Sequence, residues 1–152
     1  MTISTLDHAG IAARLPHAGR MCLLDRLLHW TPRAIHCSAT SHHDPLNPLR
    51  TPSGLLAPCA IEYAAQAMAL HGALCGPSGA PPAHGMLVSV RDTRFAGARL
   101  DLVPGALQVR AERLGADARQ MQYRFVVADE AGKVFAEGRA TIVLVAGEGS
   151  GS

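Results

Sequence analysis

The sequence predicts an α+β fold in which one long central helix is wrapped by a curved antiparallel sheet. One observation is that residues 58–74 are almost wholly apolar, as in a helix that is buried on every side. A second is that four segments rich in β-forming residues follow it, with turn signals between them. A helix that is apolar all round must be covered, and a sheet wrapped around it meets that demand, whereas a helical bundle does not.

The elements before the helix are less regular. Residues 21–28 are mostly apolar and fit a strand or a helix, because periodicity alone does not decide so short a run. In "AIHCSATSH" the residues Ile35, Cys37 and Ala39 share one face, which predicts a half-buried strand. Residues 45–54 then hold three prolines and a glycine, so we expect an ordered loop, and long loops are often functional.

The helix and the strands after it have clear boundaries. Pro58 fits the first turn of a helix, which we expect to continue to about Leu74, before "CGPSGAPP" ends it. The strand segments are "GMLVSVRDTRF", "ALQVRAERL", "QMQYRFVVAD" and "KVFAEGRATIVLVA", separated by "VPG", "LGADA" and "DEAGK". We therefore expect a single domain over residues 1–146 and a flexible Gly/Ser tail over 147–152.

Composition excludes several classes of protein. Aromatic residues make up only 4% of the 152 residues, so we expect Leu, Val, Ala and Met to fill the core rather than rings. No apolar run is long enough to span a membrane and no signal peptide is evident, which predicts a cytoplasmic protein. Four scattered cysteines without a CxxC pair argue against zinc ribbons and redox motifs. A net charge of +2 is too small to indicate nucleic acid, but leaves an acidic protein partner open.

The polar residues of the helix are the first candidates for chemistry. Glu62 and Gln66 are four residues apart, so they form one polar stripe on an otherwise apolar helix. The helix N-terminus favours an ionised Glu62, whereas an apolar cleft favours the neutral form. A carboxyl balanced between these effects titrates near neutrality, as a general acid or base requires. The alternative is a first-turn acid that is open to water.

Two adjacent histidines are the second candidates. His42 and His43 precede the proline-rich loop that leads into the helix carrying Glu62. A histidine and a glutamate in one cleft form an acid/base pair with distinct proton affinities. The alternatives are an exposed loop start and a zinc site, but no third ligand is evident, so we predict no metal.

Three ordered motifs of the chain together resemble one known enzyme family. They are "RLPHAGRMCLLDRLLHW", "AIEYAAQAM" and "SVRDTRFAGARLDLVPGALQVRAE". In this order they are similar to the opening motif, the helix motif "LxEAMAQ" and the strand, "RF", "PGD" and strand segment of the 3-hydroxyacyl-acyl-carrier-protein dehydratase family of the FabZ/FabA type. The divergent loop and helix look most like the atypical ApeP-like dehydratase subunits of aryl-polyene and xanthomonadin-type pigment clusters.

The resemblance implies a hot-dog fold and a dimer with its active sites at the subunit interface. It implies dehydration of a 3-hydroxyacyl thioester on acyl carrier protein to the trans-2-enoyl thioester, in fatty-acid or pigment biosynthesis. It implies that no cofactor is needed, with the substrate carried on the phosphopantetheine of the carrier. Arginines such as Arg91, Arg94 and Arg99 are candidates for contact with that acidic carrier, or are ordinary solvated strand residues.

The resemblance also assigns site residues. Glu62 matches the carboxylate that assists departure of the hydroxyl, and Gln66 matches the glutamine after it. Ala57 stands where a backbone N–H polarises the thioester carbonyl, and His17 matches the histidine of the opening motif, near the substrate.

The family's histidine base does not transfer directly. Pro48 stands at its spacing from Glu62, but an insertion in the loop lets His42 or His43 reach the same place, with His42 narrowly favoured. Two other functions stay open. One is a non-catalytic or half-site subunit of a heteromeric dehydratase, paired with a second hot-dog protein. The other is an acyl-thioesterase, which shares the fold and the carboxylate.

Overall fold

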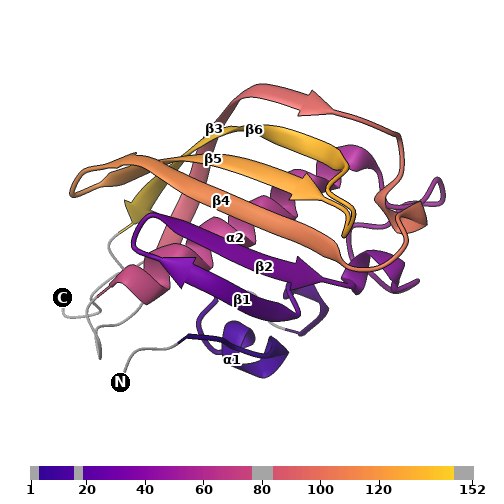
Figure 1. The fold of residues 1–152 in the computed structure, drawn as a ribbon, viewed down its shortest axis with the longest axis horizontal. Helices are drawn as coiled ribbons and strands as arrows, with labels where there is room; N and C mark the ends of the chain where they lie inside the picture. The colour runs from indigo at the N-terminus through magenta and orange to yellow at the C-terminus, as the bar shows by residue number, and fades with distance from the viewer. Residues whose placement is uncertain (1–3, 16–18, 77–83, 146–152) are drawn as a thin grey trace.

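The computed structural model describes residues 4–15, 19–76 and 84–145, and it confirms the predicted α+β architecture. One long helix packs against one curved sheet of six antiparallel strands (Figure 1). The helices and strands are α1 His8–Ala12, β1 Arg26–Thr31, β2 Ala34–Ala39, α2 Ala60–Cys75, β3 His84–Phe95, β4 Leu107–Ala116, β5 Gln120–Ala128 and β6 Val134–Val145. Four short 3₁₀ turns are η1 Gly19–Met21, η2 Ser41–His43, η3 Ala57–Cys59 and η4 Leu100–Leu102.

The strand order in the sheet is β1-β2-β4-β5-β6-β3. Strand β2 therefore pairs with β4, although α2 and β3 lie between them in sequence, and β3 pairs with β6 at the opposite edge of the sheet. The ambiguous apolar run over residues 21–28 contributes its end to β1, which pairs with β2 in a hairpin. Pairing with β2 decides a choice between helix and strand that the local pattern leaves open.

Helix α2 begins and ends close to the predicted residues. Pro58 lies in η3 and leads into α2, where its missing N–H removes no helical hydrogen bond. Gly76 follows the last residue of α2. Three alanines of α2, Ala60, Ala64 and Ala67, are fully buried, so the sheet approaches the helix closely. The described helices include none that is both long enough and apolar enough to span a membrane.

The core differs from the predicted composition. Tyr63, Tyr123 and Phe125 are the largest fully buried side chains, so the core is not filled by aliphatic residues alone. Tyr123 and Phe125 point inward from β5, where alternate residues are buried, as the period of a half-buried strand predicts. A few large aromatic rings therefore fill part of the core, although they are rare in the sequence.

Candidate active site

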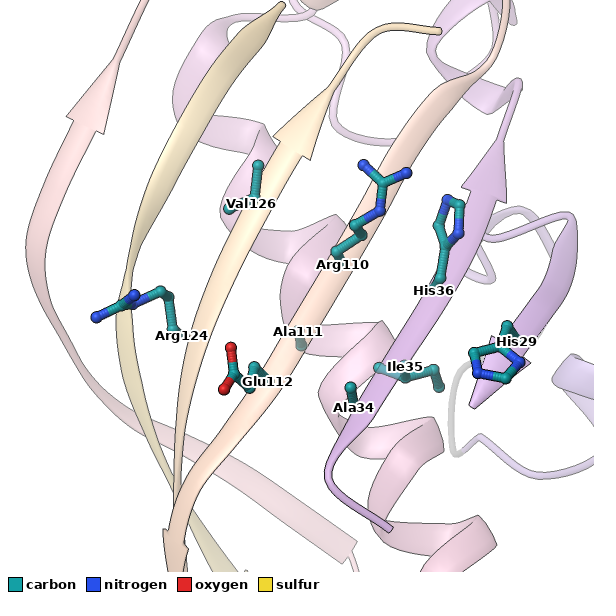
Figure 2. A pocket seen from close by; sticks show the side chains of 9 residues that line it. All are labelled: His29, Ala34, Ile35, His36, Arg110, Ala111, Glu112, Arg124 and Val126. Carbon is teal, nitrogen blue, oxygen red and sulfur yellow. The ribbon is translucent and has the colours of Figure 1, made fainter. Parts of the chain in front are cut away.

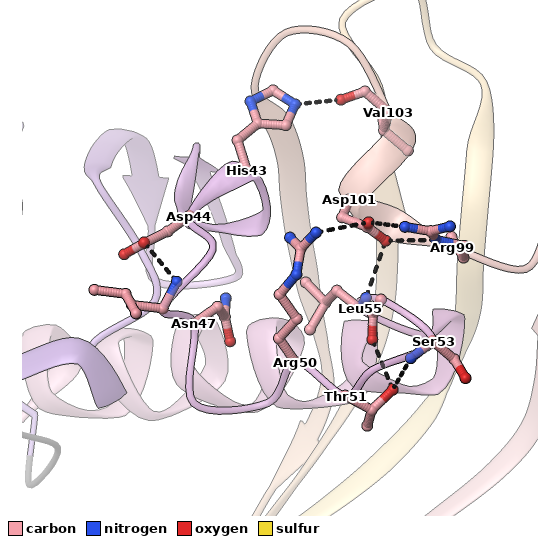
Figure 3. A network of polar contacts seen from close by, with 12 residues as sticks. His43, Asp44, Asn47, Arg50, Thr51, Ser53, Leu55, Arg99, Asp101 and Val103 are labelled. Carbon is pink, nitrogen blue, oxygen red and sulfur yellow. Dashed lines mark hydrogen bonds and ion pairs between the residues drawn. The ribbon is translucent and has the colours of Figure 1, made fainter.

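Two adjacent histidines share one backbone acceptor. His42 and His43 lie in the 3₁₀ turn η2, which packs against η4. Their Nε2 atoms lie 3.1 Å and 2.6 Å from the carbonyl oxygen of Val103 (Figure 3 shows the second contact). Because a carbonyl oxygen only accepts hydrogen bonds, each Nε2 carries a proton, and in the neutral form of each ring Nδ1 holds the lone pair.

The two histidines differ in their access to solvent. His42 is fully buried, and burial together with the neighbouring His43 lowers its pKa, so this ring is neutral at pH 7. Its Nδ1 is buried and has no hydrogen-bond partner among the described residues. His43 is exposed, and its ring centre lies 3.8 Å from that of His42. A molecule in solution therefore reaches His43 directly, whereas His42 lies beneath the surface.

A tyrosine on α2 fixes the position of the histidine turn. The hydroxyl of Tyr63 lies 2.8 Å from Ser41 Oγ and 3.2 Å from Asn47 Nδ2. Ser41 donates in turn to the Leu23 carbonyl, and Asn47 donates to the Ser41 carbonyl. Burial raises the pKa of Tyr63 to about 12, so the phenol keeps its proton. Ser41 and Asn47, on either side of the histidines in the chain, are thus both hydrogen-bonded to Tyr63, the residue after Glu62.

Glu62 and Gln66 have different environments. Glu62 is half-buried in the first turn of α2, so it is neither enclosed in an apolar cleft nor fully open to water. Gln66 is fully buried, and its amide accepts from the Leu23 N–H at 2.8 Å and donates to the Met21 carbonyl at 2.6 Å. Both ends of the Gln66 amide therefore hold the chain before β1 against the helix.

Ala57 and His17 are the two remaining residues that the sequence predicts at the site. The Ala57 N–H donates to the Ala98 carbonyl at 3.0 Å, so a thioester oxygen would have to displace that acceptor. His17 lies outside the described residues, as does the Gly/Ser tail. Among the residues that the structure describes, no group of three potential ligands could hold a metal ion.

A buried carboxylate joins the proline-rich loop to the segment that carries Val103. Asp101 accepts a hydrogen bond from the Leu55 N–H at 2.9 Å and contacts two guanidinium groups, from Arg99 and Arg50 (Figure 3). The hydrogen bonds from Arg99 hold the pKa of Asp101 well below its usual range. Asp101 thus anchors the loop that enters α2, two residues before the carbonyl that anchors both histidines.

The residues that support the site are not predicted from the sequence. For Tyr63 a signal existed, because a tyrosine stands where the resembling helix motif has a small alanine. For Asn47, Asp101 and Val103 no local signal exists, since their roles depend on contacts between distant segments.

A separate groove lies on the face of the sheet opposite α2 (Figure 2). It has a volume of about 290 Å³ and is lined by His29, Ala34, Ile35, His36, Arg110, Ala111, Glu112, Arg124 and Val126. None of the predicted site residues lines this groove, so the candidate active site lies elsewhere.

A long helix packed on a curved six-stranded antiparallel sheet defines the hot-dog class of proteins, and solved structures agree. The chain is similar to a structure of the dehydratase heterocomplex ApeI:P from Xenorhabdus doucetiae, with a TM-score of 0.74 and 24% identity, over 89% of this chain and 90% of that one. It is similar to a thioesterase from Haemophilus influenzae, with a TM-score of 0.66 and 11% identity, over 97% and 96%. It is also similar to zebrafish thioesterase superfamily member 2, with a TM-score of 0.63 and 16% identity, over 92% of this chain and 99% of that one.

Identities this low show the fold, and a sequence comparison identifies the family. A model of the ApeP-like family, described as ApeP dehydratase, matches residues 9–146. The chain therefore belongs to the ApeP-like dehydratase family. A search of curated proteins found no match.

Proposed function

We propose that the protein is a subunit of a dehydratase that removes water from a 3-hydroxyacyl thioester on acyl carrier protein, within biosynthesis of an aryl-polyene-type pigment. The observation that carries the proposal is the histidine pair anchored on Val103 and hydrogen-bonded, through Ser41 and Asn47, to the helix of Glu62. Membership of the ApeP-like dehydratase family supports the reaction type.

In this mechanism His43 is the base and Glu62 the acid. The lone pair on His43 Nδ1 takes the proton from C2 of the acyl chain, and the electron pair of that C–H bond forms the double bond to C3. The C3–O bond breaks, Glu62 protonates the leaving oxygen, and water departs. The sequence narrowly favours His42, but burial favours His43, because a base must touch its substrate and only His43 is exposed.

His42 then supports His43 from beneath. His42 is buried and neutral and is bonded to the same carbonyl, so it places no positive charge beside the base. The centres of the two rings lie 3.8 Å apart, so His42 also packs against the base.

The proposed assembly is a heterodimer with a second hot-dog subunit. The structure of ApeI:P, which is similar to this chain, is a heterocomplex. Strand β3, of 12 residues, lies at one edge of the sheet, where a partner strand can extend the pairing. In such a dimer the histidine and the carboxylate of one reaction can come from different subunits.

The test is mass-spectrometric detection of water loss from a 3-hydroxyacyl carrier protein. The chain is assayed alone and with its partner subunit, and then as Glu62→Gln, His43→Gln and His42→Gln. We expect Glu62→Gln and His43→Gln to abolish dehydration and His42→Gln to reduce it. Full activity of Glu62→Gln would eliminate the acid role, and loss in His42→Gln alone would transfer the base role to His42. Release of free thiol without an enoyl product would identify a thioesterase instead.

A further inference from the structure

Two arginines converge on one carboxylate next to the candidate active site. Arg99 contacts Asp101 through Nε at 3.2 Å and Nη2 at 2.5 Å, and Arg50 Nη2 lies 3.3 Å from the same carboxylate. The Asp101 side chain is only 3% exposed, whereas those of Arg50 and Arg99 are 29% and 39% exposed. The carboxylate thus holds both guanidinium groups in place while each still reaches solvent.

The group carries an excess of positive charge. One carboxylate faces two guanidinium ions, so one positive charge within the three residues is not compensated. A guanidinium has five N–H donors, and the contacts with Asp101 use only part of this set on each arginine. Guanidinium groups held in a fixed orientation match the oxygens of a phosphate.

The arginines lie on the same chain segments that hold the histidines. Arg99 and Asp101 begin the short segment that ends at Val103, the acceptor of both histidines, and Arg50 lies in the loop between the histidine turn and α2 (Figure 3). Two exposed leucines lie beside members of this group: Leu56 forms a β-bridge with Arg99, and Leu102 follows Asp101 in the chain. A cationic group, an apolar surface and a base therefore occur on neighbouring segments.

We propose that Arg50 and Arg99 bind the phosphate of a phosphopantetheine arm whose thioester end is presented to His43. The inference rests on the proposed function, because it supplies the substrate whose arm is bound. The phosphate contacts the solvent-facing N–H groups of the two arginines, and the aliphatic part of the arm crosses Leu56 and Leu102. Asp101 is a positioning residue that orients both guanidinium groups.

The experiment compares two thioesters of the same 3-hydroxyacyl group on the active complex. One is the 4′-phosphopantetheine thioester, and the other is the N-acetylcysteamine thioester, which has no phosphate. For Arg50→Gln we expect KM for the first to rise about tenfold, equivalent to about 1.4 kcal/mol, and KM for the second to stay constant. Arg50→Lys, which keeps the charge, should lose less. Arg124→Gln, on the opposite face of the sheet, is the control and should change neither value.

An equal effect on both thioesters would assign Arg50 a structural role only, and no effect on either would eliminate phosphate binding. If the unsubstituted complex converts neither thioester, the proposed dehydration fails and the phosphate site is tested by calorimetry. Tighter binding of 4′-phosphopantetheine than of pantetheine, lost in Arg50→Gln, would support the site. Equal binding of the two would overturn it. Thioesters of carrier protein and of coenzyme A then show which source of the arm is preferred.

Discussion

Replacing Tyr63 by phenylalanine tests whether α2 positions the histidine turn. The substitution keeps the buried ring and removes only the hydroxyl that contacts Ser41 and Asn47. Because Ser41 donates its own proton to the Leu23 carbonyl, the tyrosine hydroxyl donates to Ser41 Oγ and accepts from Asn47. The variant therefore loses two hydrogen bonds that flank His42 and His43.

The expected loss of stability follows from these two bonds. A hydrogen bond within a protein contributes about 1 kcal/mol net, so Tyr63→Phe should lower the free energy of unfolding by about 2 kcal/mol. For a chain of this size that corresponds to a decrease in Tm of about 4–8 °C. Displacement of the base from its reacting geometry should lower kcat by at least about tenfold.

Tyr123→Phe is the matched control. Tyr123 is also fully buried, and its hydroxyl lies 2.7 Å from His71 Nδ1 and 3.1 Å from Arg113 Nη2, away from the histidine turn. Both variants should lose comparable stability in thermal unfolding, but only Tyr63→Phe should lose dehydratase turnover. Equal kcat values for the two variants, or a change in unfolding free energy below about 0.5 kcal/mol for Tyr63→Phe, would refute the reasoning.

Three further outcomes are expected. Burial lowers the pKa of His42 and of His71 from 6.5, so near and below pH 6.5 the unfolded chain binds more protons than the folded chain. The free energy of unfolding measured in urea should therefore fall as the pH drops through 6.5, and a pH-independent value would contradict this. Burial raises the pKa of the Cys37 thiol to about 12, so Cys37 should resist maleimide at pH 8 in the native protein and react only after unfolding. A Cβ on Gly138 would lie 3.0 Å from the ring of a buried phenylalanine, so Gly138→Ala should cost about 1–3 kcal/mol in denaturant unfolding, whereas Gly115→Ala, with open space around it, should be neutral or stabilising.

The sequence predicts most elements of the fold because their signals are local. The apolar run after Pro58 predicts α2, and alternation in segments such as residues 120–129 predicts strands. The first strand is not predicted with certainty, because its apolar run becomes β1 only by pairing with β2. The low content of aromatic residues likewise does not predict that Tyr63 and Phe125 lie in the core, since composition does not determine which residues are buried.

The sequence also identifies the residue types that could carry chemistry: a carboxylate in an apolar helix, and two histidines before a proline-rich loop. Only the tertiary structure separated buried His42 from exposed His43, and showed that the amide of Gln66 is bonded to the backbone. The anchors Val103 and Asp101 also required the fold, since they act on segments about 50 to 60 positions earlier in the chain. Periodicity reports the neighbours of a residue along the chain, whereas burial and hydrogen-bond partners depend on which distant segments the fold brings together.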